Sequence, residues 1–368
     1  MHRSASFVVH APAFASAVGS ASLIPSTAST DARAEELCDW LRDTVALPPF
    51  TLAPASSDAS FRRYFRAALA SPWGQAPGAT TLIAMDAPPG REDCRPFIHV
   101  AKLLADADVH APRVLAADVA RGYVLLTDLG TRMYADALDA ASAPVLYGDA
   151  MDALVRWQRA SRDDALPPYD EALLRRELML FPDWYISRHV AHPLSPKERA
   201  ELGRVFDAVV ANNLAQPRVF VHRDYHSRNL MVATPNPGVI DFQDAVLGPI
   251  TYDLVSLLRD AYVEWDDERQ LDWSIRYWER ARAARLPVDR DFAAFWRDFE
   301  WMGIQRQLKV LGIFARLRIR DGKAGYVRDM PRVLGYVRRA AARYAELDSL
   351  VRLFDTLEAH AAMDGGAP

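Results

Sequence analysis

Residues 219–257 read VFVHRDYHSRNLMVATPNPGVIDFQDAVLGPITYDLVSL, and this stretch decides which fold the chain can adopt. The apolar tripeptide 219–221 predicts a short buried strand, so Asp224 falls at the start of the loop that follows it. Two further apolar segments, LMV and VI, flank the turn-forming sequence TPNPG and predict a hairpin. That hairpin would bring Asn229 and Asp241 to one end, beside Asp224.

These polar residues form a set with a definite chemistry. Phosphoryl transfer from ATP needs a carboxylate that accepts or orients a hydroxyl proton, together with an amide and a second carboxylate that hold Mg²⁺. We therefore expect Asp224 to be catalytic and Asn229 and Asp241 to bind the metal. His222 is expected to bond the loop backbone rather than act as an acid or base, and Asp253 to fix the loop through backbone N–H groups. The alternative is a polar rim on surface turns, where Asp and Asn are common.

The same stretch resembles a known enzyme superfamily. HRDYHSRN at 222–229 is similar to the H-R-D-x-x-x-x-N catalytic loop of kinases, and DFQ at 241–243 stands where protein kinases carry D-F-G. The following GPITYDL, 248–254, resembles instead the aminoglycoside and choline phosphotransferases, which act on small molecules. This resemblance implies an α+β, bilobal, protein-kinase-like fold with a small β-rich N-lobe and a larger, mostly helical C-lobe. No activation segment ending in Ala-Pro-Glu follows, which argues against a protein kinase.

Composition limits the partners that the protein can have. The chain has 368 residues, 50% of them hydrophobic, which is enough for two domains or one bilobal enzyme. A formal net charge of -4 gives no basic field for nucleic acid or an anionic membrane. The 2 cysteines lie at no metal-like spacing, and no apolar run approaches the roughly 20 residues of a membrane-spanning helix. We expect a cytoplasmic protein that works as a monomer or weak dimer.

Three regions are expected along the chain. Residues 1–30, rich in Ala and Ser, predict a disordered tail, with a poor signal peptide as the alternative. Residues 31–130 contain several strand-like segments and predict an N-lobe with a nucleotide-binding sheet and a hinge. At that hinge, backbone groups around Thr127 and Leu129 would bind adenine. Residues 131–368 are mostly helical in periodicity and predict the C-lobe, with the catalytic loop and the substrate cleft.

The expected phosphate-binding residues depart from the general kinase pattern. No G-x-G-x-x-G is present, so the loop that begins near Ser57 would hold phosphates with serine and backbone N–H groups. The next strand carries Met85 where kinases carry the lysine that pairs with the phosphates. We expect Arg62 or Arg63, in SFRRYFR, to supply the missing positive charge. The alternative is that these arginines form a solvated strand edge.

A longer series of segments sharpens the resemblance. MDAPP, LLTDLG, HRDYHSRNLM, GVIDFQDAVLGPITYDLVSLLRD and RQLKVLGIFARLRIRDGKAGYVRDMPRV, in this order, resemble the N-acetylmuramate/N-acetylglucosamine anomeric kinases of bacterial cell-wall sugar recycling. In that family MDAPP is the usual form, so Met85 would be a family feature. The resemblance implies transfer from ATP, with Mg²⁺, to the C1 hydroxyl of the sugar, giving the α-1-phosphate. The residues alone indicate only a hydroxyl of a small polar molecule.

Four residues are candidates for contact with the acceptor. Gln243 and Asp244 directly follow the expected metal ligand, while Arg306 and Lys309 could neutralise the lactyl carboxylate of muramate or form a solvated helix face. Rival acceptors are an aminoglycoside, choline or a homoserine-like alcohol, and the acidic run 264–268 could serve a polycation. A pseudokinase that binds nucleotide without transfer is the non-enzyme alternative, although a scaffold has no need for the complete catalytic set.

Overall fold

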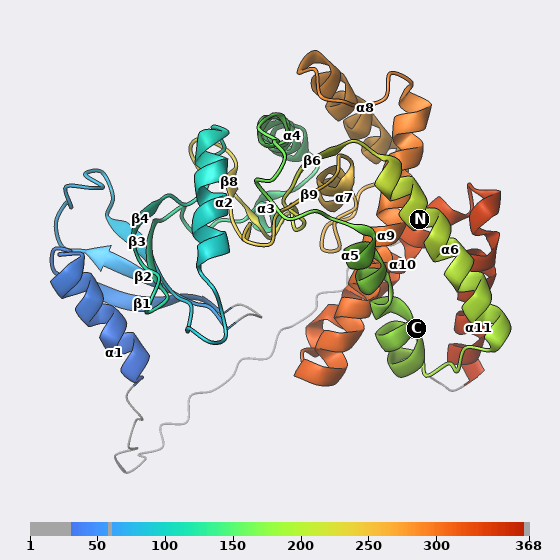
Figure 1. Cartoon of the computed structure of the whole chain (residues 1–368), viewed down its shortest axis with the longest axis horizontal. Coiled ribbons are helices and arrows are strands. Elements are labelled where there is room, and N and C mark those ends of the chain that lie inside the picture. Colours follow the sequence, from blue (N-terminus) through green and yellow to red (C-terminus); the bar gives the residue numbers. More distant parts are fainter. Residues whose placement is uncertain (1–30, 58–60, 364–368) are drawn as a thin grey trace, which may run out of the picture.

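The computed structural model describes residues 31–57 and 61–363. The tail expected at 1–30 lies outside the described residues. The described chain forms two lobes, a sheet with two helices on one side of Figure 1 and a larger helical body on the other, which confirms the predicted α+β class. The segments expected to be catalytic lie in the middle of the molecule, where α3, β6, β8, β9 and α7 meet (Figure 1).

The N-lobe is built on one antiparallel sheet. Its strand order is β1-β2-β3-β5-β4, and neighbouring strands pair antiparallel throughout. The strands are β1 (Phe50–Ser57), β2 (Arg63–Leu69), β3 (Thr81–Asp86), β4 (Val114–Asp118) and β5 (Tyr123–Thr127). The two helices are α1 (Ala32–Asp39), extended by the short π-helix η1 (Trp40–Thr44), and α2 (Arg95–Asp106).

Alternation along β3 separates the two faces of this sheet, because successive side chains of a strand point to opposite sides. Leu82 and Ala84 belong to the apolar cluster that α1 covers with Leu37. Met85 belongs to the opposite cluster, which contains Phe97 of α2 and continues into the C-lobe. The face that carries Met85 is therefore the one turned toward the C-lobe.

The C-lobe is mostly helical, with two small antiparallel strand pairs that carry the catalytic segments. Its helices are α3 (Tyr134–Ala137), α4 (Ala143–Arg159), α5 (Glu171–Leu178), η2 (Phe181–His189), α6 (Pro196–Ala215), α7 (Tyr252–Leu258), α8 (Asp267–Ala283), α9 (Phe292–Asp321), η3 (Ala324–Asp329), α10 (Met330–Ala341), η4 (Ala345–Leu347) and α11 (Asp348–Met363). The strand pairs are β6 (Arg218–Val221) with β9 (Val246–Pro249), and β7 (Leu230–Met231) with β8 (Gly238–Val239). The second pair is the hairpin that the sequence predicts.

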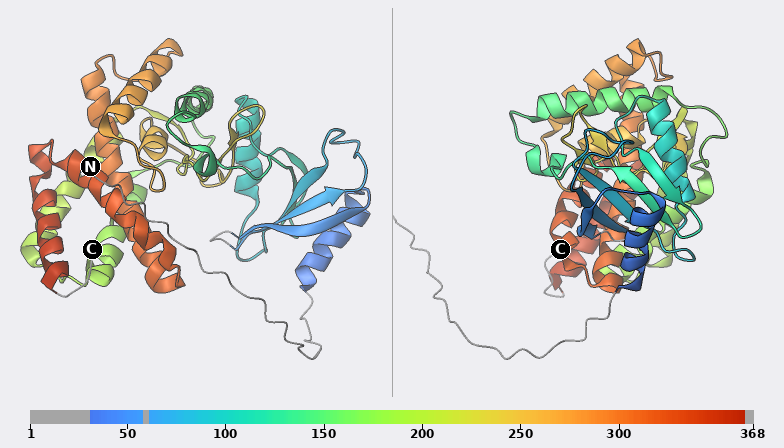
Figure 2. Two further views of the ribbon diagram at one scale, coloured as in Figure 1. Left: turned by 180° about the vertical axis from the view of Figure 1, so that it is seen from behind. Right: turned by 90° about the vertical axis from the view of Figure 1, so that its left-hand side faces the viewer.

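Helix α9 organises the C-lobe. It is 30 residues long and packs against η2, α10, α7 and α6, and the left view of Figure 2 shows it passing through the helical body. Its middle part is buried on all sides, which is the mark of a core helix rather than an amphipathic one. Several of these buried residues are polar or charged, namely Glu300, Gln305, Arg306, Gln307 and Lys309. Such groups need partners, and Lys309 finds its partner in Glu177, which also pairs with Arg223 of the loop after β6.

Among residues 31–57 and 61–363, no helix combines the length and the apolar character that crossing a bilayer requires.

Candidate active site

The catalytic loop is held at both of its edges by buried polar groups. Strand β6 ends at Val221, and the backbone N–H groups of His222 and Arg223 then donate to the two carboxylate oxygens of Asp253, at 2.7 and 3.0 Å. The Nε2 atom of the His222 ring lies 3.1 Å from the carbonyl oxygen of Ile240. Burial lowers the pKa of His222 to about 4, so the ring is neutral at physiological pH and donates this bond through Nε2–H.

Two non-glycine residues in this region have left-handed backbone. The φ angle is 78° at Arg223 and 62° at Asp241. A side chain in this region of φ costs roughly 1–3 kcal/mol, and such residues persist where the surrounding structure holds them, often at functional sites. Asp253 provides this support for Arg223. The strain lies beside the expected catalytic residue and at an expected metal ligand.

The structure brings the three central residues together. Asn229 Nδ2 donates to the backbone oxygen of Asp224 at 3.0 Å and to Asp241 Oδ2 at 3.3 Å. Gln243 Nε2 donates to Asp241 Oδ1 at 3.0 Å and to Asp244 Oδ2 at 3.2 Å. Both expected metal ligands and both expected acceptor contacts on this segment therefore lie within one hydrogen-bonded group around Asp241.

The donor set suits magnesium. Within the part of the chain that the structure describes, no group of three or more His, Cys, Asp or Glu residues could hold a metal alone. Mg²⁺ normally takes one or two protein oxygens and completes its shell with phosphate oxygens and water. One carboxylate from Asp241 and one amide oxygen from Asn229, whose amide nitrogen already donates to the protein, match this requirement.

A buried ionic network lies directly behind the catalytic loop. The carboxylate of Glu177 forms ion pairs with Arg223 and with Lys309 Nζ, the latter at 3.1 Å, and accepts a hydrogen bond from the Tyr169 hydroxyl. Lys309 also donates to the hydroxyl of Tyr252 at 3.0 Å. This network ties α5, the catalytic loop, α7 and α9 to one another.

These charges set the ionisation of the expected catalytic residue. Burial alone would raise the pKa of Asp224, but the positive charges of Lys309, His226, Arg306 and Arg223 outweigh burial and lower it to about 2. Asp224 is therefore a carboxylate across the physiological range. It can accept a hydrogen bond from a substrate hydroxyl, and the charges of Lys309, Arg306 and Arg223 stabilise negative charge nearby.

Arg306 and Lys309, which the sequence groups together, have different surroundings. Lys309 is committed to Glu177 and Tyr252. Arg306 is only 3% exposed, yet its Nε and Nη1 have no hydrogen-bond partner among the described residues. Neither residue is on a solvated helix face, so that alternative is wrong for both.

The two arginines expected near the ATP phosphates also differ. Asp86, which follows Met85 on β3, turns to the α1 face and is fully buried. Its Oδ1 accepts from Nε of Arg33 in α1 at 3.1 Å, and its Oδ2 accepts from Nε of Arg63 at 3.0 Å. Arg63 forms a second ion pair with Asp31. A phosphate role for Arg63 would require it to leave two carboxylates.

Arg62 and Ser57 flank the loop between β1 and β2. Arg62 lies one residue before β2, and alternation would direct it to the face of Tyr64, which packs on the Met85 side of the sheet. Ser57 ends β1, with its backbone opposite Arg63. The intervening residues 58–60, in which phosphate-binding backbone groups are expected, lie outside the described residues.

The segment after β5 touches the catalytic hairpin. Thr127 ends β5, and both its backbone N–H and its hydroxyl are bonded to the backbone of Arg113. Two residues later, Leu129 packs so closely on Gly238 that a Cβ there would come within 2.8 Å of Leu129 Cδ1. Glycine at 238 thus permits this contact between the lobes. The Thr127 N–H is already used, which leaves the groups near Leu129 as the candidates for adenine.

The acidic run 264–268 is not an open acidic cleft. Glu264 lies 3.5 Å from Arg332 and 3.8 Å from Arg339, and Asp267 lies 3.4 Å from Arg339. These arginines of α10 pair with two carboxylates of the run, Glu264 and Asp267, and Arg269 of α8 pairs with Asp266. The run serves as a contact between α8 and α10.

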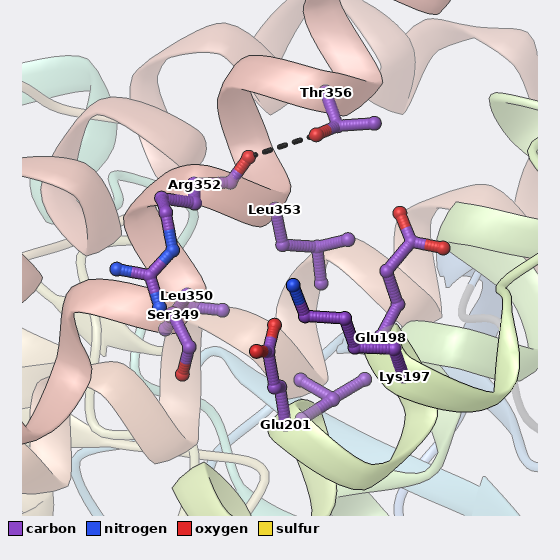
Figure 3. Close-up of a pocket in the computed structure, with 9 residues that line it drawn as sticks. Lys197, Glu198, Glu201, Ser349, Leu350, Arg352, Leu353 and Thr356 are labelled. Carbon is purple, nitrogen blue, oxygen red and sulfur yellow. Dashed lines mark hydrogen bonds between the residues drawn. The ribbon is translucent and has the colours of Figure 1, made fainter.

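A pocket of about 260 Å³ lies elsewhere, between the first turns of α6 and α11 (Figure 3). Both signs of charge line it, and the Thr356 hydroxyl beside it donates to the Arg352 backbone oxygen at 3.0 Å. None of its lining residues is a predicted site residue. The lining residues are Lys197, Glu198, Glu201, Leu202, Ser349, Leu350, Arg352, Leu353 and Thr356.

Comparison with known proteins identifies the family. The sequence profile described as "Phosphotransferase enzyme family" matches residues 51–292. A relative from Pseudomonas aeruginosa, named N-acetylmuramate/N-acetylglucosamine kinase, is 48% identical over 339 residues, covering 89% of this chain and 98% of that protein. A relative of the same name from Neisseria meningitidis is 44% identical over 335 residues, covering 90% and 98%.

A solved structure shares the fold. The ADP-bound aminoglycoside phosphotransferase APH(2'')-Ib matches with a TM-score of 0.53 over 82% of this chain and 97% of that one, at 13% sequence identity. At this identity the likeness shows the fold, and it confirms the predicted protein-kinase-like architecture. The chain therefore belongs to the phosphotransferase enzyme family, and it is an ATP-dependent phosphotransferase whose acceptor is an alcohol group.

Proposed function

We propose that the enzyme transfers the γ-phosphoryl group of ATP to the anomeric C1 hydroxyl of N-acetylmuramate, N-acetylglucosamine or both, giving the α-1-phosphate for cell-wall sugar recycling. The observation that carries this proposal is the 44–48% identity, over almost the full length of both proteins, to the kinases named for these two sugars. The arrangement of Asp224, Asn229 and Asp241 supports it, because a kinase needs these groups in contact.

The expected chemistry follows from the charges around Asp224. The transition state of phosphoryl transfer is loose, so the protein's main tasks are positioning and charge stabilisation. With a pKa near 2, the Asp224 carboxylate is a weak base in the ground state and chiefly orients the acceptor hydroxyl. As the oxygen of the acceptor hydroxyl bonds to phosphorus, the hydroxyl becomes acidic, and Asp224 then takes its proton. Asn229 and Asp241 would hold magnesium, which would supply positive charge against the phosphates.

The proposal extends to the organisation of the enzyme. The nucleotide would lie between an N-lobe of residues 31–130 and a C-lobe of residues 131–368, with the sugar on the C-lobe side of Asp224. Gln243 and Asp244 would contact the acceptor next to the metal. We further propose that the enzyme works in the cytoplasm, as a monomer or weak dimer.

The test is phosphate transfer from Mg-ATP to N-acetylmuramate, N-acetylglucosamine, glucose, choline and kanamycin, with the product position determined by ³¹P NMR. We expect a 1-phosphate on at least one N-acetyl sugar. Transfer to choline or kanamycin instead would overturn the sugar assignment. Nucleotide binding without any transfer would support the pseudokinase alternative.

A variant pair tests the role of Asp224 in the same assay. Asp224→Ala should lower turnover by about 10²–10⁴-fold, because it removes the group that accepts the hydroxyl proton. Nucleotide binding and thermal stability should change little. The matched control is Asp106→Ala, an exposed carboxylate on α2 that should leave turnover unchanged. Turnover at the level of the wild type in Asp224→Ala would contradict the assignment.

A further inference from the structure

Arg306 is buried without the partners that a buried guanidinium requires. It lies on the same face of α9 as Lys309, one turn earlier, and its Nε and Nη1 have no hydrogen-bond partner among the described residues. An arginine always carries its charge, and burying that charge without hydrogen bonds is strongly unfavourable. Lys309 and Arg223, in contrast, share the carboxylate of Glu177. Arg306 is thus the cation that a bound anion would satisfy.

Arg306 belongs to a group of charged side chains near Asp224 that also contains Arg228 and the buried carboxylate of Asp260, whose two oxygens accept from the backbone N–H groups of Ser227 and Tyr262. The charge of Arg306 acts on Asp224 and on His226, whose Nδ1 is also buried without a partner among the described residues. The His226 ring meets the Tyr262 ring edge-on, with centroids 5.4 Å apart, and Arg228 lies over the same ring at 3.5 Å. Burial raises the pKa of Tyr262, and the charges of Arg228 and Arg306 oppose that rise. Arg306 and His226, both with unsatisfied polar atoms, therefore interact electrostatically with each other and with Asp224, and Arg228 adds a cation over the Tyr262 ring.

We propose that Arg306, with His226 beside it, binds the carboxylate of the acceptor sugar and thereby selects N-acetylmuramate over N-acetylglucosamine. This inference rests on the proposed function. The two sugars differ in the lactyl ether at C3, which ends in a carboxylate where N-acetylglucosamine has only a hydroxyl. A planar guanidinium binds a carboxylate through two parallel hydrogen bonds, and His226 Nδ1–H can donate a third. N-acetylglucosamine would leave these buried donors unpaired, and sites with unpaired polar groups discriminate against such substrates.

The test compares kcat/KM for the two sugars in the wild type, in Arg306→Gln and in Arg306→Lys. We expect Arg306→Gln to lose about 10–100-fold on N-acetylmuramate, as for a lost hydrogen-bonded charge, while N-acetylglucosamine changes by less than about 3-fold. Arg306→Lys keeps the charge but loses the two parallel hydrogen bonds of the guanidinium, so its kcat/KM on N-acetylmuramate should lie between those of the wild type and Arg306→Gln. The control is Arg320→Gln, an exposed arginine on the same helix, which should change neither sugar. If Arg306→Gln left the ratio of the two kcat/KM values unchanged, whether by equal losses on both sugars or by no loss on either, the inference would be overturned.

A second measurement does not depend on the variants folding. The wild type is assayed with N-acetylmuramate and with its uncharged carboxamide analogue, which has the same size. We expect the carboxamide to be about 10-fold or more worse in kcat/KM, and equal turnover of acid and carboxamide would overturn the inference. If the wild type phosphorylates N-acetylglucosamine but not N-acetylmuramate, the inference fails while the proposed function stands. If it phosphorylates neither sugar, the proposed function fails.

Discussion

The side-chain amide of Asn229 connects the catalytic loop to Asp241, with Nδ2 3.3 Å from Asp241 Oδ2. The same nitrogen donates to the backbone of Asp224, so one amide fixes the distance between the expected catalytic and metal-binding groups. Asp241 holds its position with left-handed backbone. The two residues therefore act as one unit.

Removing either member of this unit should weaken magnesium binding. We expect Asp241→Asn, which keeps the size and removes the charge, to raise the Mg²⁺ concentration for half-maximal activity by about 10–100-fold. Asn229→Ala should act in the same direction, because it removes a ligand and two hydrogen bonds. Activity is measured during an Mg²⁺ titration at fixed ATP, with Asn212→Ala, whose amide bonds Asp298 in the C-lobe, as the control. An unchanged Mg²⁺ dependence in both variants would show that the metal binds elsewhere.

The neighbouring residues Arg62 and Arg63 should give different phenotypes. Arg63→Ala should mainly lower stability, by about 1 kcal/mol, because Asp86 keeps Arg33 as its remaining partner. Arg62→Ala should raise the ATP Michaelis constant, by about 10-fold for a lost charged contact to phosphate. Steady-state kinetics at saturating sugar and urea unfolding separate the two effects. If neither variant raises that constant, the charge that replaces the missing lysine comes from another residue.

Glu177 should matter more for stability than its position on α5 suggests. Glu177→Gln leaves Arg223 and Lys309 buried without their shared counter-charge, and breaking a buried ion pair costs about 3–5 kcal/mol. Urea unfolding measures this loss. Glu171→Gln on the same helix removes only an exposed pair with Arg175 and should change stability by less than about 1 kcal/mol. Equal stability of the two variants would mean that solvent or other groups compensate both cations.

His222 should make the fold sensitive to mild acid. Its pKa is about 4 in the folded chain and near 6.5 in the unfolded chain, so only the unfolded chain takes up this proton between those values. The contribution of His222 to the free energy of unfolding is therefore complete above about pH 6.5 and is lost as the pH falls toward 4. Between pH 7.5 and 4.5 the wild type should lose about 2–3 kcal/mol more than His222→Gln. Other titrating groups, including His226, are shared by both proteins and cancel in the comparison. Parallel pH curves for the two proteins would contradict the neutral, buried state of His222.

Local pattern was enough to predict the catalytic hairpin and the β-rich N-lobe. The apolar segments around Asp224, Asn229 and Asp241 end where the loop and the hairpin begin, so their meeting follows from short-range rules. The fold class follows from the same segments and from the resemblance of the whole series.

Side-chain pairing over long distances could not be predicted in this way. Arg63 finds Asp86 23 residues away, and Arg223 finds Glu177 46 residues away, so no local pattern indicates either pair. The sequence offered Tyr252 only as part of a motif and gave no sign of a role for Tyr169. Lys309 and Arg306 look equivalent on a helix, and only packing against Glu177 distinguishes them.

The buried thioether at Met85 has a consequence for chemical labelling. Reagents built as nucleotides with a reactive acyl group label kinases by acylating the lysine amine beside the phosphates. On β3 this enzyme presents Met85, fully buried and without an amine. Such reagents would find no lysine amine on that strand, so profiling methods that rely on this lysine would overlook the enzyme even when it is abundant and active.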